Sequence, residues 1–151
     1  MADPNPAAHP ARLCRLEPIA IDAPASLSDF AMSVPDAGAI MSFTGQVRPF
    51  REGVAVSHLH LQAHDTLTKA LMTERLDWAC GHWSLDGGSM IHRIGDVARG
   101  DTIVLVATAS AHRRGGGKAP GEKMGLIKKE GPGLERGKKG PRRAWVGAPA
   151  P

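Results

Sequence analysis

The chain has 151 residues, of which 42% are hydrophobic and 23% charged, and these values fit a single soluble globular domain with a core of ordinary size. Only 4% are aromatic and none is tyrosine, so the core should be aliphatic, and the formal net charge of +4 suggests an anionic partner. The two cysteines lack CxxC-type partners, which argues against a disulfide framework and a zinc site, and no stretch has the length of a signal or membrane segment, so a cytoplasmic protein is expected.

The first elements are a weak strand and a helix. Residues 1–11 are rich in proline and are expected to be disordered. The next stretch, Arg12–Ile21, alternates loosely and predicts a short or edge strand. Ser26 is the expected N-cap of a helix over residues 27–32, and Pro35 is expected to stop it.

Two further strands follow, joined by a loop that carries two arginines. Gly38–Val47 predicts the first of them, and Val54–Ala63 alternates strongly enough to predict one continuous strand. The Pro/Gly loop between them contains Arg48 and Arg51. Because loops on rigid strands often carry function, both arginines are candidate site residues.

The second of these strands contains two histidines, His58 and His60, on one face. Two imidazoles at this spacing can share a metal ion, but no third ligand is visible at a useful spacing. A solvent-facing strand is therefore the preferred interpretation, and no metal site is predicted.

A long helix is predicted next, over Asp65–Cys80, because apolar residues form a broad stripe along one side. Asp65 or Thr66 is expected to cap it, and Gly81 is expected to end it. We expect Trp78 to lie in the core rather than at a functional site.

Three segments complete the predicted core. A turn at residues 86–88 leads into a short strand over Ser89–Ile94, and Gly95–Gly100 is expected to be a polar connector. Asp101–Arg114 begins with an uninterrupted apolar run, which suits a strand covered on both faces. Since the connections are too short for repeated parallel crossovers, the predicted fold class is α+β, a single domain with a mostly antiparallel sheet packed with helices.

The end of the last strand is the first candidate site. It carries His112, Arg113 and Arg114 in succession. A proton-transfer side chain beside guanidinium groups, mounted on a rigid strand, is suited to bind an anion. The alternative is a strand that simply ends in polar residues.

Four motifs, in this order, make the chain resemble a known family, the large catalytic subunit of molybdopterin synthase. They are FTGQVR (43–48), LQAHDTLTKAL (61–71), IHRIGDVARGD (91–101) and SAHRR (110–114). The resemblance implies an α/β hammerhead-like fold. It also implies a sulfurtransferase that converts cyclic pyranopterin monophosphate into molybdopterin by inserting the two sulfurs of the dithiolene.

The resemblance implies partners but no metal and no cofactor. The sulfur donor would be a thiocarboxylate on the Gly-Gly C-terminus of a small ubiquitin-like subunit. Two large subunits would form a homodimer with a small subunit at each end, a heterotetramer active in molybdenum cofactor biosynthesis.

Five site residues follow from the resemblance. Arg48, His112 and Arg113 match positions that line the substrate pocket, and His112 is also a candidate for proton transfer. Lys128 matches the first catalytic lysine and is the expected sulfur-transfer residue. Arg143 is the candidate contact to the substrate phosphate.

The last part of the chain, 115–151, departs from the family pattern. Glu135 stands where the family has a second lysine, and at most a short helix over Glu122–Glu130 is expected. We therefore divide the chain into residues 1–11, a family core over 12–114, and this divergent Gly/Pro/Lys-rich segment. Glycine and proline replace expected helix formers at Gly115, Gly116, Gly117, Pro120, Gly121 and Gly125.

Two alternative functions remain open at this point. The divergent segment raises the hypothesis of a catalytically impaired subunit that dimerises and binds the small subunit without turnover. Its lysines and arginines also raise the hypothesis of a nucleic-acid-binding protein, although aromatic residues for stacking on bases are almost absent there.

Overall fold

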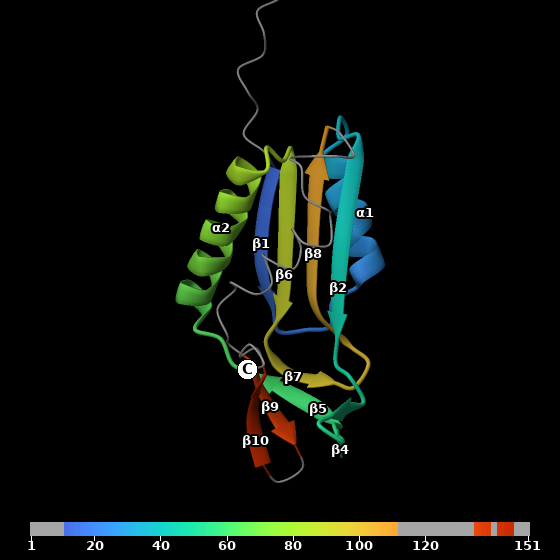
Figure 1. Cartoon of the computed structure of the whole chain (residues 1–151), viewed down its shortest axis with the longest axis vertical. Helices are drawn as coiled ribbons and strands as arrows, with labels where there is room; N and C mark the ends of the chain where they lie inside the picture. Colours follow the sequence, from blue (N-terminus) through green and yellow to red (C-terminus); the bar gives the residue numbers. More distant parts are fainter. Residues whose placement is uncertain (1–10, 112–134, 140–141, 147–151) are drawn as a thin grey trace, which may run out of the picture.

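A computed structural model of the chain describes residues 11–111, 135–139 and 142–146. It contains two four-stranded sheets, a small hairpin and two helices (Figure 1). The first sheet has the order β1-β6-β8-β2, with β1 at Ala11–Glu17, β2 at Ala39–Gln46, β6 at Gly87–Arg93 and β8 at Thr102–Ser110. The second has the order β10-β9-β5-β7, with β5 at His58–Leu61, β7 at Gly95–Ala98, β9 at Glu135–Lys139 and β10 at Arg142–Val146.

The predicted α+β class with a mostly antiparallel sheet is confirmed. Strand β1 pairs in parallel with β6, whereas β6 with β8 and β2 with β8 are antiparallel, as are all pairs of the second sheet. The predicted edge strand at Arg12–Ile21 is also found, because β1 lies at the edge of the first sheet. Proline at position 18 follows its last residue, where no further ladder hydrogen bond is needed.

Helix α1 (Ala23–Ser33) starts earlier than the sequence analysis predicted. Its N-cap is Asp22, whose carboxylate oxygen accepts a hydrogen bond from the Ala25 backbone amide at 3.0 Å. The prediction of Ser26 as the cap is wrong, because Pro24 fits the first turn and lets the helix begin before that serine. The predicted end before Pro35 is confirmed.

Helix α2 (Asp65–His82) is longer than predicted at its C-terminal end. The prediction of Asp65 or Thr66 as the cap is wrong, because the N-cap is His64, whose ring accepts from the Leu67 amide. Gly81 lies inside the helix instead of ending it. The core position predicted for Trp78 is also wrong, since this side chain is 43% exposed and stacks on His82 with ring centroids 4.7 Å apart. The glycine continues the helix because Trp83, the C-cap, is buried and holds this end against the core.

Strand β8 is covered on both faces, as its apolar run predicted. On one face, Ala107 and Ala109 pack against Phe30 and Val34 from α1 and the residue after it. On the other face, Val106 joins a cluster with α2 residues (Met72, Leu76, Ala79 and Cys80). The strand is therefore a rigid central element.

Two predictions about the second sheet are wrong. Gly95–Gly100 is not a connector, because β7 pairs antiparallel with β5 and buries Val97 completely. Val54–Ala63 is not one strand. It is divided at Val56 and Ser57 into β4 (Val54–Ala55) and β5, and β4 forms a hairpin with β3 (Phe50–Arg51) inside the predicted loop.

Arg93 joins the two sheets at the end of β6. Its side chain is buried, and its guanidinium donates to the backbone carbonyl of Glu17 at 3.4 Å and to that of Asp96 at 2.8 Å. Glu17 ends β1 and Asp96 belongs to β7, so a single side chain bonds to a strand of each sheet.

The described segments contain the helices α1 and α2. Neither of them has the length together with the apolar character that crossing a bilayer requires.

Candidate functional site

Arg48 is an exposed side chain on a fixed backbone. It follows β2 directly after Val47, which is buried. The Val47 amide donates to the Asp101 carbonyl at 3.0 Å, and the Gly100 amide donates to the Val47 carbonyl at 2.9 Å. These bonds hold the chain next to the start of β8. The backbone that carries Arg48 is therefore fixed in position.

For the other predicted site residues, the structure describes either the backbone alone or nothing. His112, Arg113 and Lys128 lie outside the described residues. Arg143 lies in β10, where its backbone is in register with Lys138 of β9. The last described residue before the predicted histidine is Ala111, just after β8.

The β2–β8 ladder separates the two halves of the predicted pocket. In this ladder Ala39 pairs with Ser110, and Gln46 pairs with Thr102 (Figure 1). Arg48 therefore lies beside the start of β8, whereas Ala111 lies at its end. At about 3.4 Å per residue from Thr102 to Ala111, these points are roughly 30 Å apart. Within one chain the structure does not bring Arg48 and the exit of β8 together.

The second sheet contains a cavity that sequence reasoning missed. It has a volume of about 500 Å³ and lies at the end of β5 and the start of β7. His60 and His64 contribute to its wall, and His60 Nδ1 lies 2.8 Å from a carboxylate oxygen of Asp96. The remaining lining residues are Leu61, Gln62, Ala63, Ile94 and Gly95.

Strand β9 pairs with β5, which lines this cavity. In this pair Leu61 is in register with Glu135, and His60 with Arg136. The position that the family resemblance assigns to a second lysine is thus in register with Leu61, the residue after His60 on the paired strand. The alternation over Val54–Ala63 placed His60 on an outward face but gave no sign of Asp96, which is distant in sequence.

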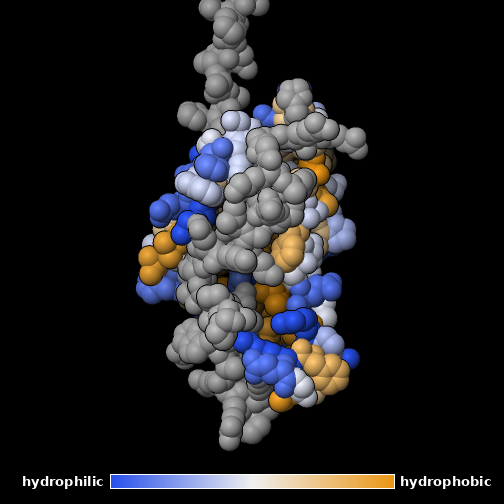
Figure 2. All heavy atoms as spheres, viewed as in Figure 1, coloured by the Kyte–Doolittle hydropathy of each residue, from blue (hydrophilic) through white to orange (hydrophobic). Residues whose placement is uncertain are grey.

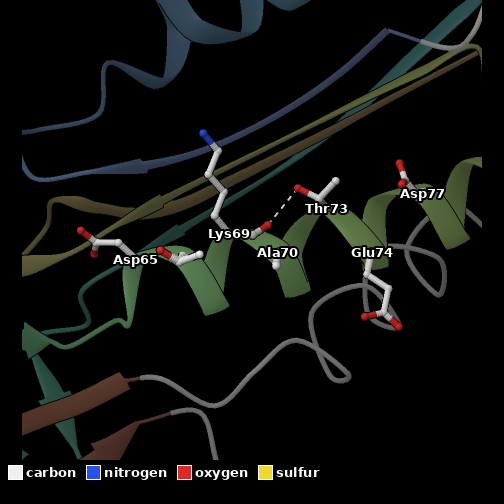
Figure 3. Close-up of a pocket in the computed structure, with 7 residues that line it drawn as sticks. Asp65, Lys69, Ala70, Thr73, Glu74 and Asp77 are labelled. Atoms are coloured by element: carbon white, nitrogen blue, oxygen red, sulfur yellow. Dashed lines mark hydrogen bonds between the residues drawn. The ribbon is translucent and has the colours of Figure 1, made fainter.

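A second cavity, of about 740 Å³, lies along α2 and does not suit an anionic substrate (Figure 3). Its charged lining consists of one ammonium group, Lys69, against the carboxylates of Asp65, Glu74 and Asp77. The Thr73 hydroxyl already donates a hydrogen bond within the helix, to the Lys69 carbonyl at 2.8 Å. The net negative lining repels phosphate and thiocarboxylate groups.

Neither thiol is arranged as a nucleophile or a metal ligand. Cys14 and Cys80 are both free, and burial raises the pKa of each, so both remain protonated near neutral pH. Within the described part of the chain, no three His, Cys, Asp or Glu residues are grouped so that they could hold a metal ion.

Comparison with known sequences identifies relatives. The family model described as "MoaE protein" matches residues 17–130. The molybdopterin synthase catalytic subunit of Ralstonia nicotianae is 31% identical over 134 residues, which cover 89% of this chain and 76% of that protein. The same subunit of Escherichia coli is 35% identical over 111 residues, 74% of each chain. The match to that of Vibrio cholerae, 44% identical over 77 residues, spans only 51% of each chain.

Solved structures share the fold. The MoaE protein of Burkholderia ambifaria has a TM-score of 0.72 at 24% identity, covering 92% of this chain and 91% of that one. Molybdopterin synthase from Staphylococcus aureus has a TM-score of 0.68 at 23% identity and covers 89% and 96%. A complex of subunits 1 and 2 of molybdopterin-converting factor from Helicobacter pylori has 0.65 at 17%, covering 95% and 93%.

These matches bear on the family resemblance and on the nucleic-acid-binding alternative. None of the proteins named above is described as a nucleic-acid-binding protein, so that alternative gains no support. The profile match covers most of the chain, and two named relatives exceed 30% identity over more than two thirds of their own length. The chain therefore belongs to the MoaE protein family, as its four motifs predicted.

Proposed function

We propose that the chain is the catalytic subunit of a molybdopterin synthase. It transfers sulfur from the thiocarboxylated C-terminus of a small ubiquitin-like subunit to cyclic pyranopterin monophosphate and so forms the dithiolene of molybdopterin. The observation that carries this proposal is the match to the Ralstonia nicotianae catalytic subunit over 134 residues.

The chemistry of Arg48 supports the same proposal. Both reactants are anions, one a thiocarboxylate and the other a cyclic phosphate. An exposed guanidinium on a fixed backbone can hold either of them with two parallel hydrogen bonds. Arg48 is therefore proposed to bind substrate.

The remaining site residues are proposed from the family motifs alone. His112 and Arg113 bind substrate, and His112 also moves protons. Lys128 carries the sulfur-transfer step, and Arg143 contacts the phosphate. Their side chains lie beyond what the structure describes.

A homodimer is part of the proposal because of the β2–β8 ladder. Arg48 and Ala111 lie at opposite ends of this ladder. A pocket that uses Arg48 together with the residues after Ala111 is most simply completed by a second copy of the chain. Twofold symmetry then creates two equal pockets, each available to one small subunit. The Helicobacter pylori complex of subunits 1 and 2 is consistent with such a partner.

Two further features complete the proposal. The chain is placed in the cytoplasm, where free thiols such as Cys14 and Cys80 stay reduced. Its division into residues 1–11, the core 12–114 and the segment 115–151 is retained, and the family match runs past the boundary at 114 to residue 130.

Reconstitution tests the proposed activity. The purified chain is mixed with a thiocarboxylated small subunit and the cyclic pyranopterin monophosphate, and the dithiolene product is measured. The same partners with an active catalytic subunit from a relative serve as the control. Product is expected; a stable complex without product would instead support the catalytically impaired subunit, and absence of both would reject the proposal.

A further inference from the structure

The pairing of β2 with β8 contains a β-bulge near the end of β2. Up to the pair of Gly45 with Val104, the two strands keep a single register. The next pair is Gln46 with Thr102, so Ile103 is an extra residue on β8. A bulge bends the strand pair and changes the direction of the residues that follow it, and bulges are common beside functional sites.

The packing around the bulge explains why it forms here. The side chain of Ile103 is buried in the apolar cluster that also contains Val47. On the other strand, a Cβ atom at Gly45 would lie only 2.9 Å from Val104 Cγ1, so the close approach of the strands favours glycine. The bulge is therefore a packed feature of the fold.

The bulge changes the residue that lies opposite Asp101. If the register of Gly45 and Val104 continued without a shift, Arg48 would lie opposite Asp101. Directly opposed side chains have Cβ atoms about 4.5–5.5 Å apart, and opposite charges at this distance attract each other. The Asp101 carbonyl instead accepts from the Val47 amide at 3.0 Å, so Asp101 lies beside Val47.

The offset leaves the guanidinium of Arg48 available to other anions. Arg48 and Asp101 are both exposed, and within the described part of the chain no ion pair joins them. Figure 2 shows hydrophilic atoms at the surface in the lower half of the molecule, where β2 ends in Figure 1. A guanidinium that already holds a carboxylate must release it before it binds another anion with both of its parallel hydrogen bonds.

We propose that the bulge at Ile103 positions Arg48 for anion binding, because the extra residue moves Asp101 away from the place opposite Arg48. This inference rests on the proposed function and adds a structural cause for the availability of Arg48. Ile103 and Gly45 are then positioning residues, which act through the backbone of Val47 and do not touch the substrate.

Two variants of Gly100 test whether a nearby carboxylate matters to Arg48. The Gly100 amide donates to the Val47 carbonyl at 2.9 Å, and a side chain added at Gly100 would meet nothing within 4 Å. The φ value of 86° at Gly100 is tolerated better by Asp and Asn than by most residues. Gly100→Asp therefore adds a carboxylate beside the peptide bond between Val47 and Arg48, and Gly100→Asn adds a similar shape without the charge.

Deletion of Ile103 tests the bulge itself. Without this residue the two strands can keep one register, which places Arg48 opposite Asp101. Asp101→Asn, added to the deletion, then removes the charge that Arg48 would meet. Thermal unfolding shows whether each variant is folded, and if the deletion variant is not, the two Gly100 variants decide alone.

Two quantities are measured for each variant. The first is the rate at which phenylglyoxal modifies Arg48, followed by peptide mass spectrometry, because a guanidinium held by a carboxylate reacts more slowly. The second is KM for cyclic pyranopterin monophosphate, with the full chain assembled with the small subunit. Compared with Gly100→Asn, Gly100→Asp is expected to slow the modification and to raise KM about 2- to 5-fold.

Deletion of Ile103 should have the same two effects, and Asp101→Asn should reverse them. In the otherwise unmodified chain, Asp101→Asn should leave the modification rate of Arg48 unchanged. A faster rate there would mean that Arg48 is already paired with Asp101, and it would overturn the inference. Equal rates for the two Gly100 variants, or a folded deletion variant without any effect, would overturn it as well. Because the modification needs no turnover, an inactive unmodified chain would reject the proposed function alone.

Discussion

Arg48 is a proposed site residue for which the motif and the backbone structure give different kinds of support. The FTGQVR motif identified it, and the backbone bonds of Val47 explain why a side chain at this point is held in a constant position. Sequence alone could not reveal that the exit of β8 lies at the other end of the same ladder, because the register of a strand pair is a property of two distant segments.

Replacement of Arg48 by alanine should lower kcat/KM for the pterin substrate about 10- to 100-fold, since a hydrogen bond to a charged group contributes about 1.5–3 kcal/mol. Arg48→Lys should recover part of this loss, because it keeps the charge but not the fork. The midpoint temperature of thermal unfolding should be unchanged for both Arg48 variants. Arg15→Ala, which removes an arginine paired with Glu17 on the surface, is the control and should keep full activity. An unchanged kcat/KM for Arg48→Ala would remove this residue from the site.

At the scale of elements, strands and helices with many apolar residues were predictable. The ranges of β2, β8 and α2 agree with the patterns at Gly38–Val47, Asp101–Arg114 and Asp65–Cys80. The short strands were not predictable. In β7 only Val97 is buried, and its pairing with β5 supplies the hydrogen bonds that make it a strand. One buried residue gives too weak a pattern to distinguish a strand from a connector.

The start of α1 offers a direct comparison of the predicted and observed caps. Asp22→Ala should lower the free energy of unfolding by about 1 kcal/mol, because the Ala25 amide loses its acceptor. Ser26→Ala should have a smaller effect, since Ser26 lies inside the helix. Urea unfolding of the two variants measures the difference. A larger loss for Ser26→Ala would contradict the observed cap.

Two glycines, Gly88 in β6 and Gly81 in α2, should respond in opposite ways to alanine. A Cβ atom at Gly88 would lie 2.5 Å from Leu76 Cδ1, and Leu76 is fully buried. Gly88→Ala should therefore cost about 1–3 kcal/mol of stability. At Gly81, within α2, nothing lies within 4 Å of such an atom, so Gly81→Ala should stabilise the protein by about 0.5 kcal/mol or more. Chemical denaturation measures the free energy of unfolding of both variants. Equal changes for the two variants would contradict the close contact between Gly88 and Leu76.

At the scale of the whole molecule, a shared pocket leads to a complementation experiment. Arg48→Ala and Arg113→Ala chains are co-expressed with different tags, and product formation is compared with that of each variant alone. If each pocket takes Arg48 from one copy and Arg113 from the other, a mixed dimer keeps one intact pocket. Random assembly should then restore about one quarter of the normal activity. No recovery in isolated mixed dimers would mean that both residues serve the same pocket from a single chain.

The buried guanidinium of Arg93 has a consequence for cooperativity. Arg93 lies in β6 and bonds to carbonyl oxygens of Glu17 in β1 and Asp96 in β7, so the second sheet cannot detach from the first without breaking the bond between the buried guanidinium and the Asp96 carbonyl. We therefore expect the two sheets to unfold as one cooperative unit, so that the backbone around Arg48 and the cavity at β5 are lost together.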